Sequence, residues 1–116
     1  MGKQKIPKML KDRIIRDSQY YEAIIQVRNP SDELINFINN QLNKKKDIFI
    51  SNIVPQKEGF DIFISSQRFA RSLGNRMKKA FRKSQLKNSR SIFTRNRQTS
   101  KDVYRVCVMF RLNASE

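Results

Sequence analysis

Residues 59–73 read GFDIFISSQRFARSL, and this stretch predicts a strand that runs directly into a helix. Residues 60–65 are dominated by isoleucine and phenylalanine, which are typical of strands. Ser65 or Ser66 then stands where a helix N-cap is expected. The helical pattern of apolar residues that follows continues to about Lys83.

The segments on the N-terminal side predict three more elements. Apolar and polar residues alternate over residues 20–28, which indicates a strand. A helix is expected next, with Asn29 as its N-cap and Pro30 in its first turn. Residues 47–54 predict another strand, which would form a hairpin with the strand at 60–65.

On the C-terminal side, a long strand is predicted at residues 101–112, after a less periodic segment. The resulting order predicts an α+β fold, a ferredoxin-like βαββαβ sandwich with an extra strand near the C-terminus. Helices would cover one face of the sheet. We expect a basic N-terminal arm at 1–17, a single α+β domain at 18–112 and a short tail at 113–116.

The charge of the chain is concentrated in its second half. The net charge is +15, yet residues 18–67 hold five bases and six acids. Residues 68–111 hold fourteen bases and one acid. Such a local excess of one sign indicates a surface that meets a polyanion.

The helix predicted after Ser66 separates its apolar and basic residues. At about 100° per residue, Phe69, Leu73, Met77 and Phe81 fall on one narrow face and should anchor the helix on the sheet. The bases occupy nearly the opposite half, where a solvated face would normally mix charge signs. The helix and a basic loop at 87–101 are therefore predicted to bind nucleic acid through Arg68, Arg71, Arg76, Lys78, Lys79, Arg82, Lys83, Lys87, Arg90, Arg95, Arg97 and Lys101.

The predicted loop suits RNA in particular. Its Arg, Asn, Ser and Thr side chains can all bond to phosphates and sugars, and an irregular RNA surface fits such a loop better than a regular duplex groove. Phe63 and Tyr104 are candidate stacking platforms for bases, although Phe and Tyr on strands are more often packed in a core.

The composition argues against an enzyme. The chain has no histidine, three glycines and one cysteine. Asp61 is expected to pair with a nearby arginine, and Cys107 to be a buried thiol on an apolar strand. We expect no catalytic residue, metal, cofactor or small-molecule substrate. No apolar stretch approaches the ~20 residues of a membrane span, and the lone cysteine fits a reducing cytoplasm.

Three segments carry a resemblance to a known family: YYEAIIQVRNP at 20–30, KEGFDIFISSQRFARSL at 57–73 and VYRVCVMFRL at 103–112. They resemble the NMD-type large-ribosomal-subunit export adaptor family. The Cys-x-x-Cys pairs that precede this region in the family are missing here, as is the translation-factor-like region that follows it. The chain looks like a stand-alone copy of one domain. The matching positions are Tyr21, Ala23, Ile25, Gln26, Val27, Arg28, Gly59, Phe60, Asp61, Ile62, Phe63, Ser65, Ser66 and Ala70.

The resemblance implies binding to the large ribosomal subunit, but not nuclear export, because the family's receptor-binding part is missing. We expect a cytoplasmic, ribosome-associated protein that docks on large-subunit ribosomal RNA, with neighbouring ribosomal proteins as further contacts. The alternative is an adaptor whose basic face meets an acidic protein. The sequence leaves open which RNA element is bound, whether the protein is a permanent ribosomal component or a transient factor, its oligomeric state, and whether another chain supplies the zinc region.

Overall fold

A computed structural model describes residues 7–15, 20–45, 47–96 and 101–113, with side chains throughout except at 91–96 and 101–103. Helices and strands both occur, so the predicted α+β class is confirmed. The elements are α1 (Lys8–Lys11), β1 (Ala23–Arg28), α2 (Asp32–Asn43), β2 (Ile50–Gln56), β3 (Gly59–Ile64), α3 (Gln67–Ala80), β4 (Ser84–Asn96) and β5 (Lys101–Leu112).

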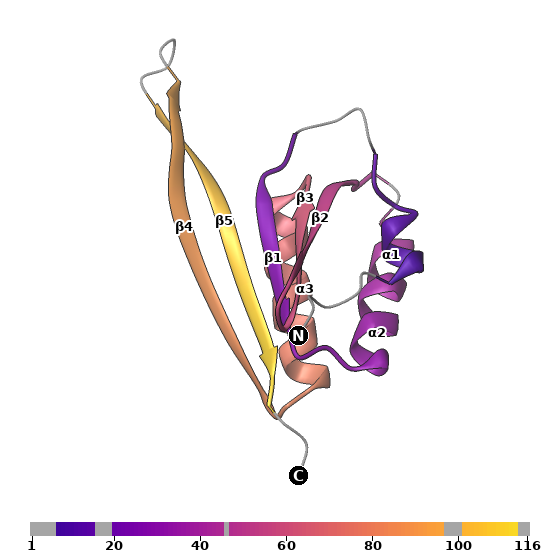
Figure 1. The fold of residues 1–116 in the computed structure, drawn as a ribbon. Helices are drawn as coiled ribbons and strands as arrows, with labels where there is room; N and C mark the ends of the chain where they lie inside the picture. Colours follow the sequence, from indigo (N-terminus) through magenta and orange to yellow (C-terminus); the bar gives the residue numbers. More distant parts are fainter. Residues whose placement is uncertain (1–6, 16–19, 46, 97–100, 114–116) are drawn as a thin grey trace.

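The described strands form one mixed sheet in the order β2-β3-β1-β5-β4 (Figure 1). β3 runs antiparallel to both β1 and β2, β5 runs parallel to β1, and β4 pairs antiparallel with β5. The ferredoxin-like order is not confirmed, because that order would place the first strand after α3 directly beside β1. Here β4 turns back as a hairpin, so that the more apolar β5 takes the interior place and the polar β4 lies at the edge.

The core lies between one face of this sheet and the helices α2 and α3. Alternate residues of β1 and β5 are buried, as Ala23, Ile25 and Val27 are in β1, which is the pattern of a sheet with one covered face. In β3 the residues between the alternate core positions, Gly59 and Asp61, are buried as well. α3 buries the apolar face that the sequence predicts, including Phe69, Leu73, Met77 and Ala70. Phe81, the C-cap residue, is partly buried, and its ring packs edge-on against that of Phe37, with 5.8 Å between ring centroids.

The N-terminus of α2 differs from the prediction. Its N-cap is Ser31, whose Oγ accepts a hydrogen bond from the backbone N–H of Leu34 (3.2 Å). Asn29 instead adopts a φ of 52°, a left-handed conformation that asparagine tolerates better than most residues. Its backbone N–H donates to the Glu58 carbonyl (2.7 Å), which ties the end of β1 to the β2–β3 turn. The Asn-Pro pair therefore makes a turn before the helix.

The prediction of a basic loop at 87–101 is wrong for residues 87–96, because residues 84–96 form the long strand β4. Residues 97–100 lie outside the described residues. The strand is weakly periodic in sequence because it lies at the edge of the sheet, where Gln85 and residues 87–90 are exposed and Leu86 packs against the core. The extra strand expected near the C-terminus is confirmed.

Residues 7–15 pack against the other edge of the sheet. Leu10 in α1 is fully buried in the core. The backbone N–H of Ile15 donates to the Ile50 carbonyl (2.8 Å), and Ile14 makes a parallel bridge with Ile50. Arg13 Nε donates to Asn39 Oδ1 in α2 (2.9 Å). These contacts cover the edge of β2 at its first residue, Ile50.

Candidate nucleic-acid interface

The N-terminal end of α3 is fixed by two side chains, those of Ser66 and Glu22. Ser66 is the N-cap, as one of the two predicted candidates, and its Oγ accepts from the backbone N–H of Phe69 (3.1 Å). The backbone N–H of Gln67 donates to the Glu22 carboxylate (2.9 Å), so an internal anion already occupies the positive end of the helix dipole. A ligand anion is therefore more readily bound along the side of α3 than at its N-terminus.

Four cations form the outer face of α3 and the turn that follows it, and we call them the basic face: Arg68, Arg71, Lys79 and Arg82. All four side chains are exposed, and none forms an ion pair with the described residues. They come into line because Arg68 and Arg71 lie three residues apart, as do Lys79 and Arg82, and the eight residues between Arg71 and Lys79 are about two helical turns. Their mutual repulsion disfavours the free protein and would be relieved by a bound polyanion.

Two other predicted cations of α3 make contacts within the protein. Arg76 Nη1 donates to Gln41 Oε1 (2.7 Å), which links α3 to α2. Lys78 Nζ donates to the backbone carbonyls of Arg82 (3.3 Å) and Ser84. The Lys78 ammonium thus closes the turn between α3 and β4, where the negative end of the helix dipole favours a cation. Both residues have a structural role whether or not RNA is bound.

The predicted cations on β4 divide between the two faces of the sheet. Arg90 pairs with Val106, whose side chain lies on the face covered by α3. Lys87 pairs with Met109 on the opposite face, because successive residues of a strand alternate. Lys83 is exposed just before β4. Arg97 lies outside the described residues, and Arg95 and Lys101 are described only through their backbone in the β4–β5 hairpin.

The β4–β5 hairpin continues beyond the N-terminal end of β1, as Figure 1 shows for the orange and yellow strands. β1 pairs with β5 only from Val106 to Arg111, whereas β4 pairs with β5 back to Lys101. The projecting part carries Tyr104, whose side chain is 38 % exposed. The Arg90 guanidinium lies over the Tyr104 ring, 5.2 Å from its centroid.

Two contacts near this point were not predicted from sequence. Gln67 Nε2 donates to the Tyr104 carbonyl (2.8 Å), which ties the first turn of α3 to the hairpin. Asn88 and Arg90 line a pocket together with Arg71 from α3. Leu86, Asn88 and Arg90 are spaced two residues apart. If residues 84–96 had been assigned to a strand, this spacing would have placed Asn88 and Arg90 on the same face as Leu86, toward α3.

The other candidate stacking residue, Phe63, lies on the sheet face away from α3. It pairs with Ile24 in β1, and its partly buried ring packs edge-on against Tyr21, with 4.8 Å between centroids. The Arg105 guanidinium stacks on the same Tyr21 ring, 3.7 Å from its centroid. Phe63 is thus held in an aromatic cluster within the protein, whereas Tyr104 lies beside the basic face.

Comparison with known families decides the relationship that the sequence motifs indicate. The model of the family described as "NMD3, second domain" matches residues 20–112 of this chain. The chain belongs to the NMD3 family. That family is connected with the ribosome and associates with its large subunit. A search of curated proteins finds no match.

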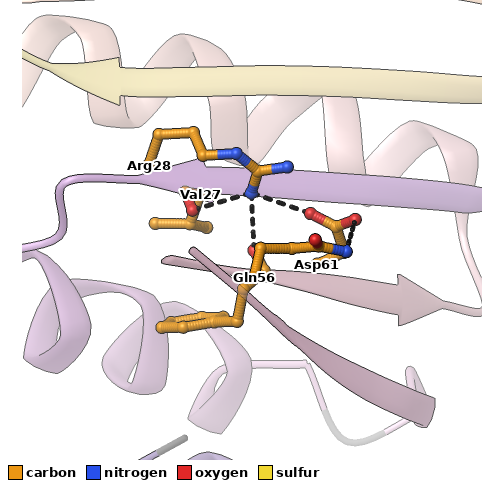
Figure 2. A network of polar contacts seen from close by, with 5 residues as sticks. Val27, Arg28, Gln56 and Asp61 are labelled. Atoms are coloured by element: carbon orange, nitrogen blue, oxygen red, sulfur yellow. Dashed lines mark hydrogen bonds and ion pairs between the residues drawn. The ribbon is translucent and has the colours of Figure 1, made fainter. Parts of the chain in front are cut away.

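The NMD3-type motifs of this chain meet in space, and their contacts are structural. Arg28 Nη1 donates to Asp61 Oδ1 (2.8 Å), and Gln56 Nε2 donates to Asp61 Oδ2 (3.1 Å), as Figure 2 shows. The same Arg28 nitrogen donates to the carbonyls of Val27 (3.0 Å) and Phe60 (3.4 Å). The pairing of Asp61 with an arginine is confirmed, and its carboxylate is fully engaged in joining three strands.

Gly59 of the same motif is required by close packing between β1 and β3. A Cβ atom at this position would lie 1.9 Å from the Val27 carbonyl oxygen. The matching positions on the strands therefore specify how β1 and β3 pair. Arg68 and Arg71 of the basic face lie within the segment 57–73, but none of the four basic-face residues is among its matching positions.

Other features of the described residues concern catalysis and membranes. Burial raises the pKa of the Cys107 thiol above its ordinary value, and Asp61 contributes in the same direction. The thiolate, which is the nucleophilic form, is therefore disfavoured at neutral pH. Within the described ranges there is no group of three or more His, Cys, Asp or Glu residues that could hold a metal ion. None of the described helices is long and apolar enough to cross a membrane.

Proposed function

We propose that this protein is a ribosome-associated RNA-binding protein that docks on large-subunit ribosomal RNA through the basic face of α3. The observation that carries this proposal is the set of four exposed cations without a carboxylate partner among the described residues. Membership of a family that associates with the large subunit supports the choice of RNA.

The chemistry of the basic face suits phosphate groups. Arg68, Arg71 and Arg82 present planar guanidinium groups, which can bind phosphate oxygens in pairs, and Lys79 adds a point charge. Because these contacts read the backbone, we expect binding to depend on RNA shape more than on base sequence. The NMD3-type motifs would serve binding indirectly, by fixing the sheet on which α3 is anchored.

In this proposal the protein acts by binding and not by catalysis, and it works in the cytoplasm without a cofactor. The raised pKa of Cys107 and the structural engagement of Asp61 support this view. Whether the protein is a permanent ribosomal component or a transient factor is a separate question that its distribution between free and bound pools would answer.

Sedimentation of the tagged protein with ribosomal particles tests the proposal. We expect the wild-type chain to sediment with large subunits at low salt, and a variant with Arg68→Gln, Lys79→Gln and Arg82→Gln to remain in the soluble fractions. A matched control with Lys11→Gln, Lys44→Gln and Lys57→Gln removes three exposed charges elsewhere and should still sediment. Equal loss in both variants would mean that net charge alone drives association. Persistent binding of the first variant, or binding that remains after RNase treatment, would favour an acidic protein partner.

A further inference from the structure

The pocket between α3 and the β4–β5 hairpin differs in charge from a larger pocket elsewhere in the described chain. It measures about 270 Å³ and is lined by Arg71, Asn88, Ser89, Arg90 and Val106, with two guanidinium groups and no carboxylate. The larger pocket, of about 460 Å³, is lined by both signs of charge, including Glu22 and Asp47 with Arg68 and Lys45. The positive charge of the smaller pocket's lining favours an anionic ligand.

The two arginines of the smaller pocket come from different elements that are fixed relative to each other. Arg71 lies on α3, one turn after Gln67, whose side-chain amide donates to the Tyr104 carbonyl (2.8 Å). Arg90 lies on β4 opposite Val106. This hydrogen bond and the strand pairing hold both walls of the pocket, so the backbone positions of the two arginines are fixed before any ligand arrives.

The ring of Tyr104 positions the Arg90 guanidinium. The guanidinium lies 5.2 Å from the ring centroid, within the range of a cation–π contact. Stacking on a ring uses the face of the guanidinium and leaves its in-plane N–H groups able to donate to a phosphate. The size of the pocket matches a phosphate with its sugar, because it is slightly below the ~300–1,000 Å³ of sites that enclose whole ligands.

We propose that this pocket binds a backbone phosphate of an unpaired RNA segment, with Arg71 and Arg90 as the phosphate ligands and Tyr104 as the residue that positions Arg90. An unpaired segment is favoured because the Tyr104 ring, which is partly exposed and lies next to the pocket-lining Arg90, can meet a base that is not stacked in a duplex. The inference rests on the proposed RNA-binding function and adds the site and the form of RNA that it takes.

The test measures binding of the full chain to a ten-nucleotide oligouridylate and to a ten-base-pair RNA duplex. Replacement of both arginines, Arg71→Gln with Arg90→Gln, should weaken oligouridylate binding about ten- to hundred-fold, the range for lost charge-assisted hydrogen bonds. The salt slope should fall by about 0.7, as for one phosphate of a single strand. The control Lys44→Gln with Lys57→Gln removes the same charge from exposed sites elsewhere and should change affinity less than two-fold.

The role of Tyr104 is tested by two substitutions at that position. Tyr104→Phe keeps the ring and should bind oligouridylate like the wild type, whereas Tyr104→Leu should lose several-fold in affinity at unchanged thermal stability. Equal losses in the Phe and Leu variants would overturn the positioning role, because the hydroxyl and not the ring would then matter.

Two results would contradict the proposal that the pocket binds phosphate while leaving the proposed function intact. One is a double arginine variant that binds oligouridylate as tightly as the wild type. The other is a variant that loses affinity for single-stranded and duplex RNA equally, which would mean that the pocket contributes charge and no preference for unpaired RNA. If the wild-type chain binds neither ribosomal RNA nor either oligonucleotide, the proposed function itself fails.

Discussion

Replacement of Gly59 by alanine tests the strand pairing on which the rest of the fold depends. The added Cβ would lie 1.9 Å from the Val27 carbonyl oxygen, and a normal contact needs at least 3.0 Å, so the strands β1 and β3 must separate by about 1 Å. The displacement is resisted by backbone atoms on both sides. It also stretches the neighbouring hydrogen bond from the Asn29 N–H to the Glu58 carbonyl (2.7 Å). Overpacking costs ~1–3 kcal/mol and a weakened hydrogen bond ~0.5–1.5 kcal/mol, so we expect a loss of about 2–4 kcal/mol.

Urea unfolding followed by circular dichroism measures this loss as a change in the free energy of unfolding. Gly74→Ala is the matched control. Its Cβ would lie 2.9 Å from Val108 Cγ1 and 3.1 Å from Leu86 Cδ1, so the clash is with side chains and not with backbone; Leu86, which is partly buried, can shift more easily than the buried Val108. Alanine also favours the helix by about 1 kcal/mol relative to glycine. The control should therefore stay within about 1 kcal/mol of the wild type. A Gly59→Ala variant as stable as the wild type would refute the close approach of β1 and β3.

Three further predictions follow from the same structure, two on substitutions and one on the reactivity of a thiol. Leu73→Ala should cost about 2–5 kcal/mol in urea unfolding, because Leu73 is 1 % exposed; a change near 0.5 kcal/mol, as at surface sites, would mean that α3 packs through another face. Asp61→Asn should cost about 1–3 kcal/mol, since the half-buried Arg28 guanidinium loses its charged partner, and an unchanged melting temperature would argue against this pair. Because burial raises the Cys107 pKa, the thiol should react with a disulfide reagent more slowly in folded than in unfolded protein at pH 7. Its raised pKa stabilises the fold below the pKa of the unfolded thiol, and that contribution is lost as pH rises through the folded value. Reaction at the unfolded rate would contradict the burial.

The elements that could be predicted from sequence are those whose signals are local. α3 combines a serine N-cap with a clear apolar stripe, and both were found where expected. β5 spans Lys101–Leu112, as predicted, and ends where its run of alternating apolar residues does. The arginine partner of Asp61 followed from the general rule that a buried carboxylate is paired.

The features that were missed depend on pairing between distant segments. The place of β5 between β1 and β4 follows from a comparison of the two strands, because β5 offers the more apolar surface to β1 and α3. Neither segment taken alone shows which of them takes the interior place. The contact between Arg90 and Tyr104 needs the register of the hairpin, which pairs Arg90 with Val106. The hydrogen bonds from Lys78 to two backbone carbonyls depend on the path of the turn after α3. The charge pattern of the sequence does not predict that path.

The salt dependence of binding to large-subunit ribosomal RNA tests the central claim most directly. The wild-type chain should show a steep fall of log K with log salt, because each neutralised phosphate contributes about 0.7–0.9 to the slope. The variant with Arg68→Gln, Lys79→Gln and Arg82→Gln should lower that slope by about two to three while its free energy of unfolding stays within ~0.5 kcal/mol of the wild type. The wild type should also prefer this RNA to duplex DNA. An unchanged slope and affinity in the variant would show that the basic face of α3 does not bind the RNA.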